Sequence, residues 1–218
     1  MIKSAIKNLY CPLCNNSYKH TDCINLCECG KPLLVDYDYE KAKQTLTPAS
    51  LSMRVNSMWR YLEVLPVVSR ENTITLGEGM TPLQLCINLS DKYGNDQLYI
   101  KDESVNPTGS FKARGLAMAV SKAKELEVEK IIIPTAGNAG SALAAYCSRA
   151  KIKCKVIMPK STPDAFAVDT AYHGADIEKV DGSIKDAGER AAQLVKSEGF
   201  FAVSTLKEPY RIEGKKTM

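Results

Sequence analysis

Short β-rich segments alternate with helical segments from Thr81 onward, and this alternation limits the possible folds more than any other feature. Strands are predicted at residues 98–101, 131–135, 154–158, 175–180 and 201–204, and helices at about 110–126, at 139–150, after Pro163 and at 184–198. Repeated β–α units form a parallel sheet covered by helices. The sequence therefore predicts an α/β fold, a parallel sheet with helices on both faces. Ligands of such sheets bind beyond the carboxyl ends of the strands, so the segments after Lys101 and Ile133 are the first candidates for a site.

Composition and charge exclude several classes of partner. The chain has 218 residues, of which 44% are hydrophobic, enough for a packed core. Its net charge of +4 is spread along the chain without a basic cluster that could follow a phosphate backbone, so nucleic acid is not an expected partner. The sequence begins without the apolar region of a signal peptide and has no apolar run long enough to cross a bilayer. We therefore expect a cytoplasmic protein with no membrane partner.

The segment before this alternation has a different character. Residues 1–35 contain a cysteine cluster and little hydrophobic periodicity, which predicts a small ribbon-like segment unable to build a core of its own. Residues 36–80 form a connector with a short predicted helix at 39–43 and an apolar run that Pro66 ends. Trp59 within that run is the single tryptophan, and we interpret it as a packing anchor.

Five of the eight cysteines fall between residues 11 and 29, which indicates a metal site rather than a disulfide framework. Cys11 with Cys14 and Cys27 with Cys29 provide two thiolate pairs, and four thiolates can make a closed tetrahedral zinc site. The second pair is CxC rather than CxxC, and Cys23 is an alternative ligand. A closed site would be structural, because it leaves no position for substrate; the other interpretation is a vestigial ribbon that folds without metal. The remaining cysteines lie singly among apolar neighbours and are predicted to be buried free thiols: Cys86, Cys147 and Cys154.

Lys112 follows a turn between a predicted strand and a predicted helix. The chain leaves the strand at Lys101, turns through the sequence NPTG and enters a helix whose first turn carries Lys112. The positive end of the helix dipole and partial burial both disfavour the charged ammonium, so the pKa of this lysine should be depressed. A neutral amine can attack an aldehyde. Considered alone, however, a lysine after such a turn is usually a solvated surface residue.

A second glycine-containing turn follows the predicted strand at 131–135. The sequence IIIPTAGNAG leads from a buried strand into an apolar helix, and backbone amides at that helix start would face an anion. The alternative is a strand-to-helix turn that needs Gly137 only for close packing.

The sequence PTGSFKARG at residues 107–115 resembles the signature of fold-type-II pyridoxal-phosphate enzymes, and within that group it is most similar to the threonine synthases. The resemblance implies that Lys112 forms the Schiff base with pyridoxal 5′-phosphate, beside Phe111, and then moves protons on the substrate carbons. Asn138 lies 26 residues after Lys112, a spacing similar to that of the family's Asn that bonds the 3′ oxygen of the cofactor. The turn around Asn138 is implied to hold the substrate carboxylate, through Thr135, Ala136, Gly137 and Ala139.

Two flanking segments strengthen the resemblance. LGEGMTPL at 76–83 resembles the family's entry segment, and EPYRIEGKKT at 208–217 resembles its segment Pro-x-Arg-x-Glu-Gly-x-Lys-Thr. The resemblance implies a phosphorylated substrate such as O-phosphohomoserine, which needs fixed cations. Arg211 is a candidate because a guanidinium can bind a phosphate through two hydrogen bonds. Further positive field is expected from Lys101, Lys112 and Arg114, although Arg114 has the alternative of pairing with the acidic residues 102 and 103.

The family resemblance implies a reaction and a division of the chain. The reaction is conversion of O-phospho-L-homoserine and water to L-threonine and phosphate. A homodimer is expected for the full-length protein. Threonine synthases often carry a similar N-terminal ribbon. Alternatives are another fold-type-II lyase, such as a threonine dehydratase or a cysteate synthase, and a noncatalytic fragment or zinc-ribbon module. The expected parts are a ribbon, the N-terminal part of the large cofactor domain, a smaller α/β domain and the start of a C-terminal part, at residues 1–35, 36–120, 121–210 and 211–218.

The resemblance also implies that part of the active site is absent from this sequence. Family members have a glycine-rich loop that surrounds the cofactor phosphate and a Ser or Thr that contacts the pyridine nitrogen. No second glycine-rich loop of that kind occurs here. We therefore expect an N-terminal portion that binds the cofactor weakly and turns over little substrate by itself.

Overall fold

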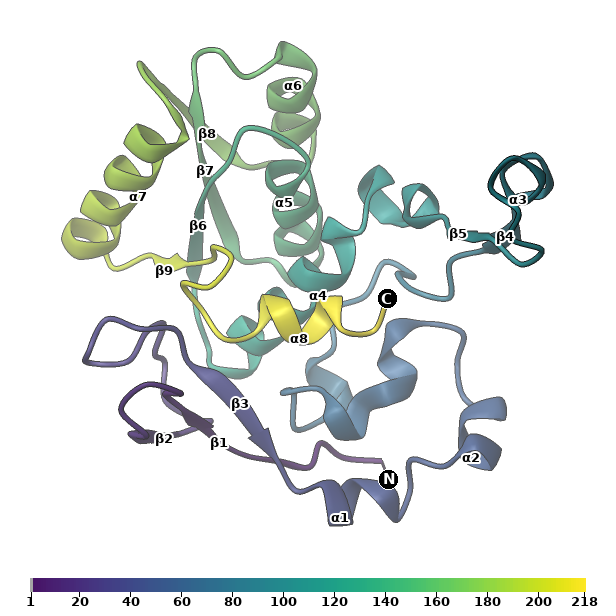
Figure 1. Cartoon of the computed structure of the whole chain (residues 1–218). Helices are drawn as coiled ribbons and strands as arrows, with labels where there is room; N and C mark the ends of the chain where they lie inside the picture. The colour runs from purple at the N-terminus through teal and green to yellow at the C-terminus, as the bar shows by residue number, and fades with distance from the viewer. Residues whose placement is uncertain (1) are drawn as a thin grey trace.

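The computed structural model describes residues 2–218, and its largest sheet is parallel (Figure 1). The strands lie in the order β8-β7-β6-β9, and every neighbouring pair runs parallel. The central strands are nearly continuous runs of buried apolar residues, as expected for strands covered on both faces. This confirms the predicted α/β class. The strand bounds are β6 (Lys130–Pro134), β7 (Lys153–Pro159), β8 (Asp176–Val180) and β9 (Phe201–Ala202).

Helices cover both faces of this sheet. In Figure 1, α5 (Ala139–Ala150) and α6 (Asp164–Tyr172) lie on one side of the strands and α7 (Ile184–Glu198) lies on the other. The sequence of α7 explains its placement: a Ser183 capping box begins the helix, its buried residues recur at helical spacing, and Gly199 ends it in the left-handed conformation. The bounds of α5 and α7 agree with those predicted from the sequence.

The N-terminal segment forms a three-stranded antiparallel sheet that the sequence analysis did not predict. Its order is β2-β1-β3, and β3 runs across position 35. The side chains of Leu9 and Leu33 are buried in the same apolar core as helices of the α/β part, which agrees with a segment that builds no core of its own. The elements here are β1 (Ile6–Tyr10), β2 (Ser17–Lys19), β3 (Leu34–Tyr37), α1 (Tyr39–Lys43), α2 (Pro48–Ser52), η1 (Met58–Val64) and η2 (Arg70–Asn72).

The predicted strand at 98–101 pairs differently from the expectation. It forms β5 (Tyr99–Lys101), which pairs antiparallel with β4 (Leu83–Leu85) in a separate two-stranded sheet. Together with α3 (Ile87–Tyr93), this pair stands away from the rest of the molecule in Figure 1. Several of its apolar side chains are exposed. The short helices η3 (Glu103–Val105) and η4 (Pro107–Gly109) then lead from β5 back to the core.

Helices α4 (Lys112–Glu125) and α8 (Arg211–Lys215) pack against each other, although they are far apart in the sequence (Figure 1). Two glycines permit this close approach. A Cβ atom at Gly115 would lie 2.9 Å from a backbone oxygen of α8, and one at Gly214 would collide with a backbone oxygen of α4. The packing brings the first turn of α4 beside α8, and with it the side chains of the candidate site.

The structure tests the expected burial of Trp59 and of three single cysteines. Trp59 is buried and donates its indole N–H to Glu78 Oε1 at 2.6 Å, in agreement with a packing anchor. Cys147 and Cys154 are buried as predicted, but Cys86 is half-exposed because it precedes α3 in the protruding segment. Within residues 2–218, no helix combines the length and the apolar character needed to cross a membrane.

Candidate cofactor and substrate site

The loop that leads into α4 is held by side-chain hydrogen bonds. Asn106 is buried; its Oδ1 accepts from the Gly79 N–H at 3.1 Å, and its amide donates to Glu103 Oε2 at 2.7 Å. Thr108 (φ 63°) and Gly109 (φ 66°) take the left-handed conformation, which is unfavourable for a threonine. The surrounding bonds therefore fix a tight turn directly before the candidate lysine.

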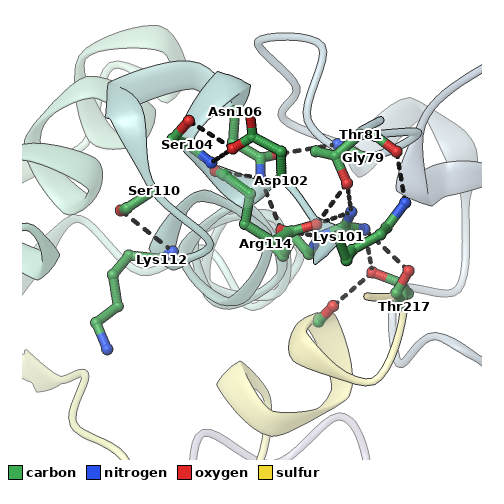
Figure 2. A network of polar contacts seen from close by, with 12 residues as sticks. Gly79, Thr81, Lys101, Asp102, Ser104, Asn106, Ser110, Lys112, Arg114 and Thr217 are labelled. Atoms are coloured by element: carbon green, nitrogen blue, oxygen red, sulfur yellow. Dashed lines mark hydrogen bonds and ion pairs between the residues drawn. The ribbon is translucent and has the colours of Figure 1, made fainter. Parts of the chain in front are cut away.

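Arg114 lies at the centre of this network (Figure 2). Its guanidinium makes two hydrogen bonds to the Glu103 carboxylate, at 2.6 and 2.7 Å, and one to Thr81 Oγ1 at 3.2 Å. It also donates to the backbone and hydroxyl oxygens of Thr217 beyond α8, at 2.9 and 3.1 Å. Burial opposes the charge on Glu103, but its bonds with Arg114 prevail and lower the pKa of Glu103 to about 2. The nearby Lys101 donates to the Thr81 carbonyl at 2.6 Å.

Lys101, Lys112 and Arg114 were all expected from the sequence to contribute positive charge to the site, but their contacts differ. Lys101 and Arg114 have partners inside the fold. The pairing alternative for Arg114 is confirmed with Glu103, whereas Asp102 caps η3. Of the three, Lys112 is the one whose side chain makes no hydrogen bond or ion pair with residues 2–218; its Nζ lies over the Phe111 ring.

Lys112 is the first residue of α4, and its side chain points away from the Arg114 network in Figure 2. Its backbone N–H donates to Ser110 Oγ at 3.4 Å. The side chain is half-buried, and Nζ lies 4.1 Å from the centre of the Phe111 ring. Burial lowers the pKa of Lys112, and the positive charge of Arg211 lowers it further. Both effects increase the fraction of neutral amine, the form that can attack a carbonyl carbon.

Arg211 and Lys215 of α8 lie next to Lys112. Arg211 is 4% exposed, and within residues 2–218 its Nε has no hydrogen-bond partner. Burial lowers the pKa of Lys215, and the charges of Arg211 and Lys112 lower it further; its Nζ is 5.9 Å from the Phe111 ring centre. The acid whose charge acts on both Arg211 and Lys215 is Glu208, and its carboxylate accepts backbone N–H bonds at the start of α8. Burial raises the pKa of Glu208 to about 7, so it is only partly ionised at neutral pH.

Arg211 was predicted from the sequence as a site residue, whereas Lys215 and Glu208 were not. A signal for Lys215 was present, because residues four positions apart on a helix share one face. Its proximity to Lys112 depends on the packing of α8 against α4, which no local pattern encodes.

The turn after β6 is placed at the carboxyl end of that strand, as predicted. Thr135 is buried, and its hydroxyl lies 3.3 Å from both the amide nitrogen and the carbonyl oxygen of Gly137. Asn138 is exposed and makes no capping bond to α5, so its amide is available to a ligand. Ala136 is exposed and Ala139 is buried. Helix α5 packs against α4 and contacts η4, which brings this helix beside the lysine loop.

The four predicted metal ligands come together in the N-terminal ribbon. The sulfur atoms of Cys11, Cys14, Cys27 and Cys29 all lie within 4.8 Å of one another, with neighbouring pairs 3.4 to 3.7 Å apart. Four thiolates at a Zn–S distance of 2.3 Å would be about 3.8 Å apart in a tetrahedron. Cys23 is not part of this group. A hydrogen bond with the Tyr18 hydroxyl, 3.1 Å away, lowers the pKa of the Cys27 thiol to about 6.

A half-buried lysine with a lowered pKa, at a strand-to-helix turn of an α/β fold, is typical of enzymes that bind a carbonyl cofactor through lysine. The sequence comparison gives the family: the chain belongs to the pyridoxal-phosphate dependent enzymes, whose family model matches residues 74–218. The cofactor of this family, pyridoxal 5′-phosphate, carries the aldehyde that such a lysine can attack.

Curated relatives and solved structures are consistent with this assignment. The chain is 38% identical to threonine synthase of Methanocaldococcus jannaschii over 95% of its length, and 35% identical to that of Methanosarcina acetivorans over 97%. It spans about half the length of these relatives, 51% in both cases. Among solved structures, it resembles threonine deaminase isoform 2 of Solanum lycopersicum, with a TM-score of 0.58, 28% identity and coverage of 63% of this chain and 38% of that one.

Proposed function

We propose that this chain supplies the lysine-bearing part of a threonine synthase site, which converts O-phospho-L-homoserine and water to L-threonine and phosphate. The observation that carries the proposal is the half-buried Lys112 beside the buried guanidinium of Arg211, whose Nε has no hydrogen-bond partner among residues 2–218. The two threonine synthases that match nearly the whole chain support the choice of reaction.

In this proposal, Lys112 has two tasks. Its amine binds the cofactor, and after exchange with the amine of the substrate it accepts and returns protons at the substrate carbons. The bound cofactor supplies the chemistry that the protein lacks, by withdrawing electrons so that protons next to the amine-bearing carbon become removable. The lowered pKa of Lys112 suits both tasks, because a base must be neutral before it accepts a proton.

The turn after β6 would orient the cofactor and the substrate. The exposed Asn138 amide would bond the 3′ oxygen of the cofactor ring, beside Phe111, and the segment from Thr135 to Ala139 would bind the substrate carboxylate. The free Asn138 side chain and the hydroxyl held next to Gly137 support these roles.

Arg211 would bind the phosphate of the substrate. A buried arginine without a partner is unfavourable, and a phosphate would satisfy its donors while offsetting its charge. This residue distinguishes the proposal from the main alternative, a deaminase acting on an unphosphorylated amino acid. The alternative is favoured by the structural similarity to the tomato threonine deaminase.

A chimera tests the choice of reaction. This chain would replace the matching half of the M. jannaschii threonine synthase, with which it aligns over 209 residues. We expect the chimera to release phosphate from O-phosphohomoserine and no ammonia from threonine, and a Lys112→Ala chimera to release neither product. Ammonia from threonine without phosphate release would favour the deaminase. A chimera that binds the cofactor and releases neither product would contradict the proposal.

We also infer that Cys11, Cys14, Cys27 and Cys29 hold a structural zinc ion, because their sulfur spacing suits a tetrahedral site. Metal analysis of protein purified without chelator should give one zinc per chain in the natural sequence and a clear loss in a Cys14→Ser variant. A Cys23→Ser control should retain the metal. Little zinc in the natural protein would favour the vestigial ribbon. The homodimer and the cytoplasmic location stay predictions from the sequence.

A further inference from the structure

Positive charge is concentrated without compensation where α4 meets α8. Lys112, Arg211 and Lys215 lie close enough that Arg211 and Lys112 lower the pKa of Lys215, and Arg211 lowers that of Lys112. Within the part of the chain that the structure describes, none of the three forms an ion pair. Glu208, whose charge acts on Arg211 and Lys215, is buried, and burial raises its pKa to about 7, so it offsets the positive charge only in part.

The two other buried cations that the structure describes are compensated. Each has a carboxylate oxygen 2.6 Å away, Glu103 for Arg114 and Glu125 for Lys122, and the partly buried Arg54 is paired in the same way with Glu63. Burying a charge without a partner is unfavourable. A cluster of cations without carboxylate partners is therefore expected where an anionic ligand binds and offsets the charge.

Two members of the cluster project from one helix face. Arg211 and Lys215 are separated by one turn of α8, and the close packing at Gly115 and Gly214 holds that helix against α4. The Lys215 stem passes 3.5 Å from the position of a Cβ at Gly115. Among residues 2–218 its Nζ makes one weak hydrogen bond, 3.5 Å to Thr205 Oγ1. The ammonium is therefore held in place while most of its donors are left for a ligand.

We propose that Lys215 and Arg211 together bind the dianion of a phosphate monoester, and that Lys215 is the residue that selects phosphorylated over unphosphorylated amino acids. The inference rests on the proposed function and deepens it. Because Lys112 binds the cofactor, Arg211 and Lys215 remain to offset the two negative charges of the phosphate. The planar guanidinium fixes two phosphate oxygens, and the ammonium adds a compact charge that favours a dianion over a monoanion.

Titration calorimetry with two small probes tests this proposal. Methyl phosphate is a dianion at pH 8, whereas methyl sulfate has a similar shape and a single charge. We expect the natural chain to bind methyl phosphate more tightly. A Lys215→Gln variant should bind it about tenfold more weakly, the scale of one lost charge-assisted hydrogen bond, and should lose most of its preference over methyl sulfate.

The matched control is Lys207→Gln, which removes the same charge from an exposed position of the segment before α8. It should change affinity by less than about twofold, because an exposed charge is screened. Circular dichroism and the thermal midpoint show whether each variant is folded. Lys215→Gln should be at least as stable as the natural chain, because it relieves repulsion.

The outcomes separate this inference from the proposed function. If Arg211→Gln weakens methyl phosphate binding and Lys215→Gln does not, the role of Lys215 is overturned and the phosphate role of Arg211 stands. If neither variant weakens binding, both are overturned. If Lys207→Gln and Lys215→Gln weaken methyl phosphate binding equally, the effect comes from the net charge of the chain, and the inference is overturned.

A last pair of titrations identifies the source of the phosphate, since the cofactor carries a phosphate monoester too. Either pyridoxal phosphate or pyridoxal would be fixed to the chain by borohydride reduction before methyl phosphate is added. A substrate site keeps its affinity in both preparations. Affinity lost with pyridoxal phosphate and retained with pyridoxal would assign the cluster to the cofactor and overturn the proposal.

Discussion

Arg114 and Arg211 are both buried where α4 and α8 meet, yet their surroundings are opposite. The guanidinium of Arg114 forms hydrogen bonds with Glu103, Thr81 and Thr217. Arg211 makes no ion pair within residues 2–218, and its Nε is without a partner. The first environment stabilises the fold, and the second leaves binding capacity that the fold does not use. Buried charge thus indicates function here only where it is uncompensated.

Loss of Arg114 should have the largest effect on stability. An Arg114→Met change leaves the partly buried Glu103 carboxylate, 12% exposed, without its cation, and breaking a buried pair costs about 3–5 kcal/mol. Denaturant unfolding measures the difference. The matched control is Lys43→Met, which breaks the exposed pair with Glu40 and should cost less than about 1 kcal/mol. Equal losses in the two variants would mean that the Arg114 network does not hold the loop.

The two regions should also respond to pH with opposite signs. The pKa of Glu103 falls from 4.5 to about 2 on folding, so its contribution to stability is present above pH 4.5 and disappears as the pH falls toward 2. The pKa of Glu208 rises from 4.5 to about 7, so its contribution is present below pH 4.5 and disappears as the pH rises through 7.

Unfolding free energies of Glu103→Gln and Glu208→Gln, each compared with the natural chain from pH 3 to 8, measure these contributions. The Glu103 difference should grow with increasing pH up to about 5, and the Glu208 difference should shrink between about 5 and 7. Profiles of the same sign would contradict the contrast between the two regions.

Loss of Arg211 should have the smallest effect on stability. Arg211→Met removes an uncompensated charge and keeps much of the apolar contact, so the unfolding free energy should stay within about 1 kcal/mol of the natural value or rise. The same variant should bind methyl phosphate far more weakly. A destabilisation as large as that of Arg114→Met would show that Arg211 is a structural residue.

The sequence predicted those parts of the fold that local patterns determine. The bounds of α7 were predicted because its buried positions recur at helical spacing and because a cap and a glycine border it. Those of α5 were predicted because an almost continuous apolar run follows a glycine-containing turn. The strands β1 to β3 were missed, since they are three to five residues long and carry polar side chains. The antiparallel pairing of β5 with β4 depends on tertiary placement, which a strand pattern does not contain.

The site divides in the same way. The sequence alone predicted Lys112, Asn138 and Arg211 as site residues, because their segments resemble motifs of the pyridoxal-phosphate dependent enzymes. The pairing of Arg114 with residue 103 was one of two alternatives that the sequence left open. Lys215 could not be assigned, because its proximity to Lys112 depends on how α8 packs against α4. Gly115 and Gly214 permit that packing, although each is an ordinary helix residue in the sequence.

The central claim is that Lys112 is the lysine that binds the cofactor, and covalent trapping tests it most directly. The chain would be incubated with pyridoxal phosphate, reduced with borohydride, digested and mapped by mass spectrometry, beside Lys112→Ala and Lys101→Ala variants. We expect the adduct on Lys112 in the natural chain and in Lys101→Ala, and no dominant site in Lys112→Ala. An adduct spread evenly over the exposed lysines, or an equal yield from Lys112→Ala, would contradict the account.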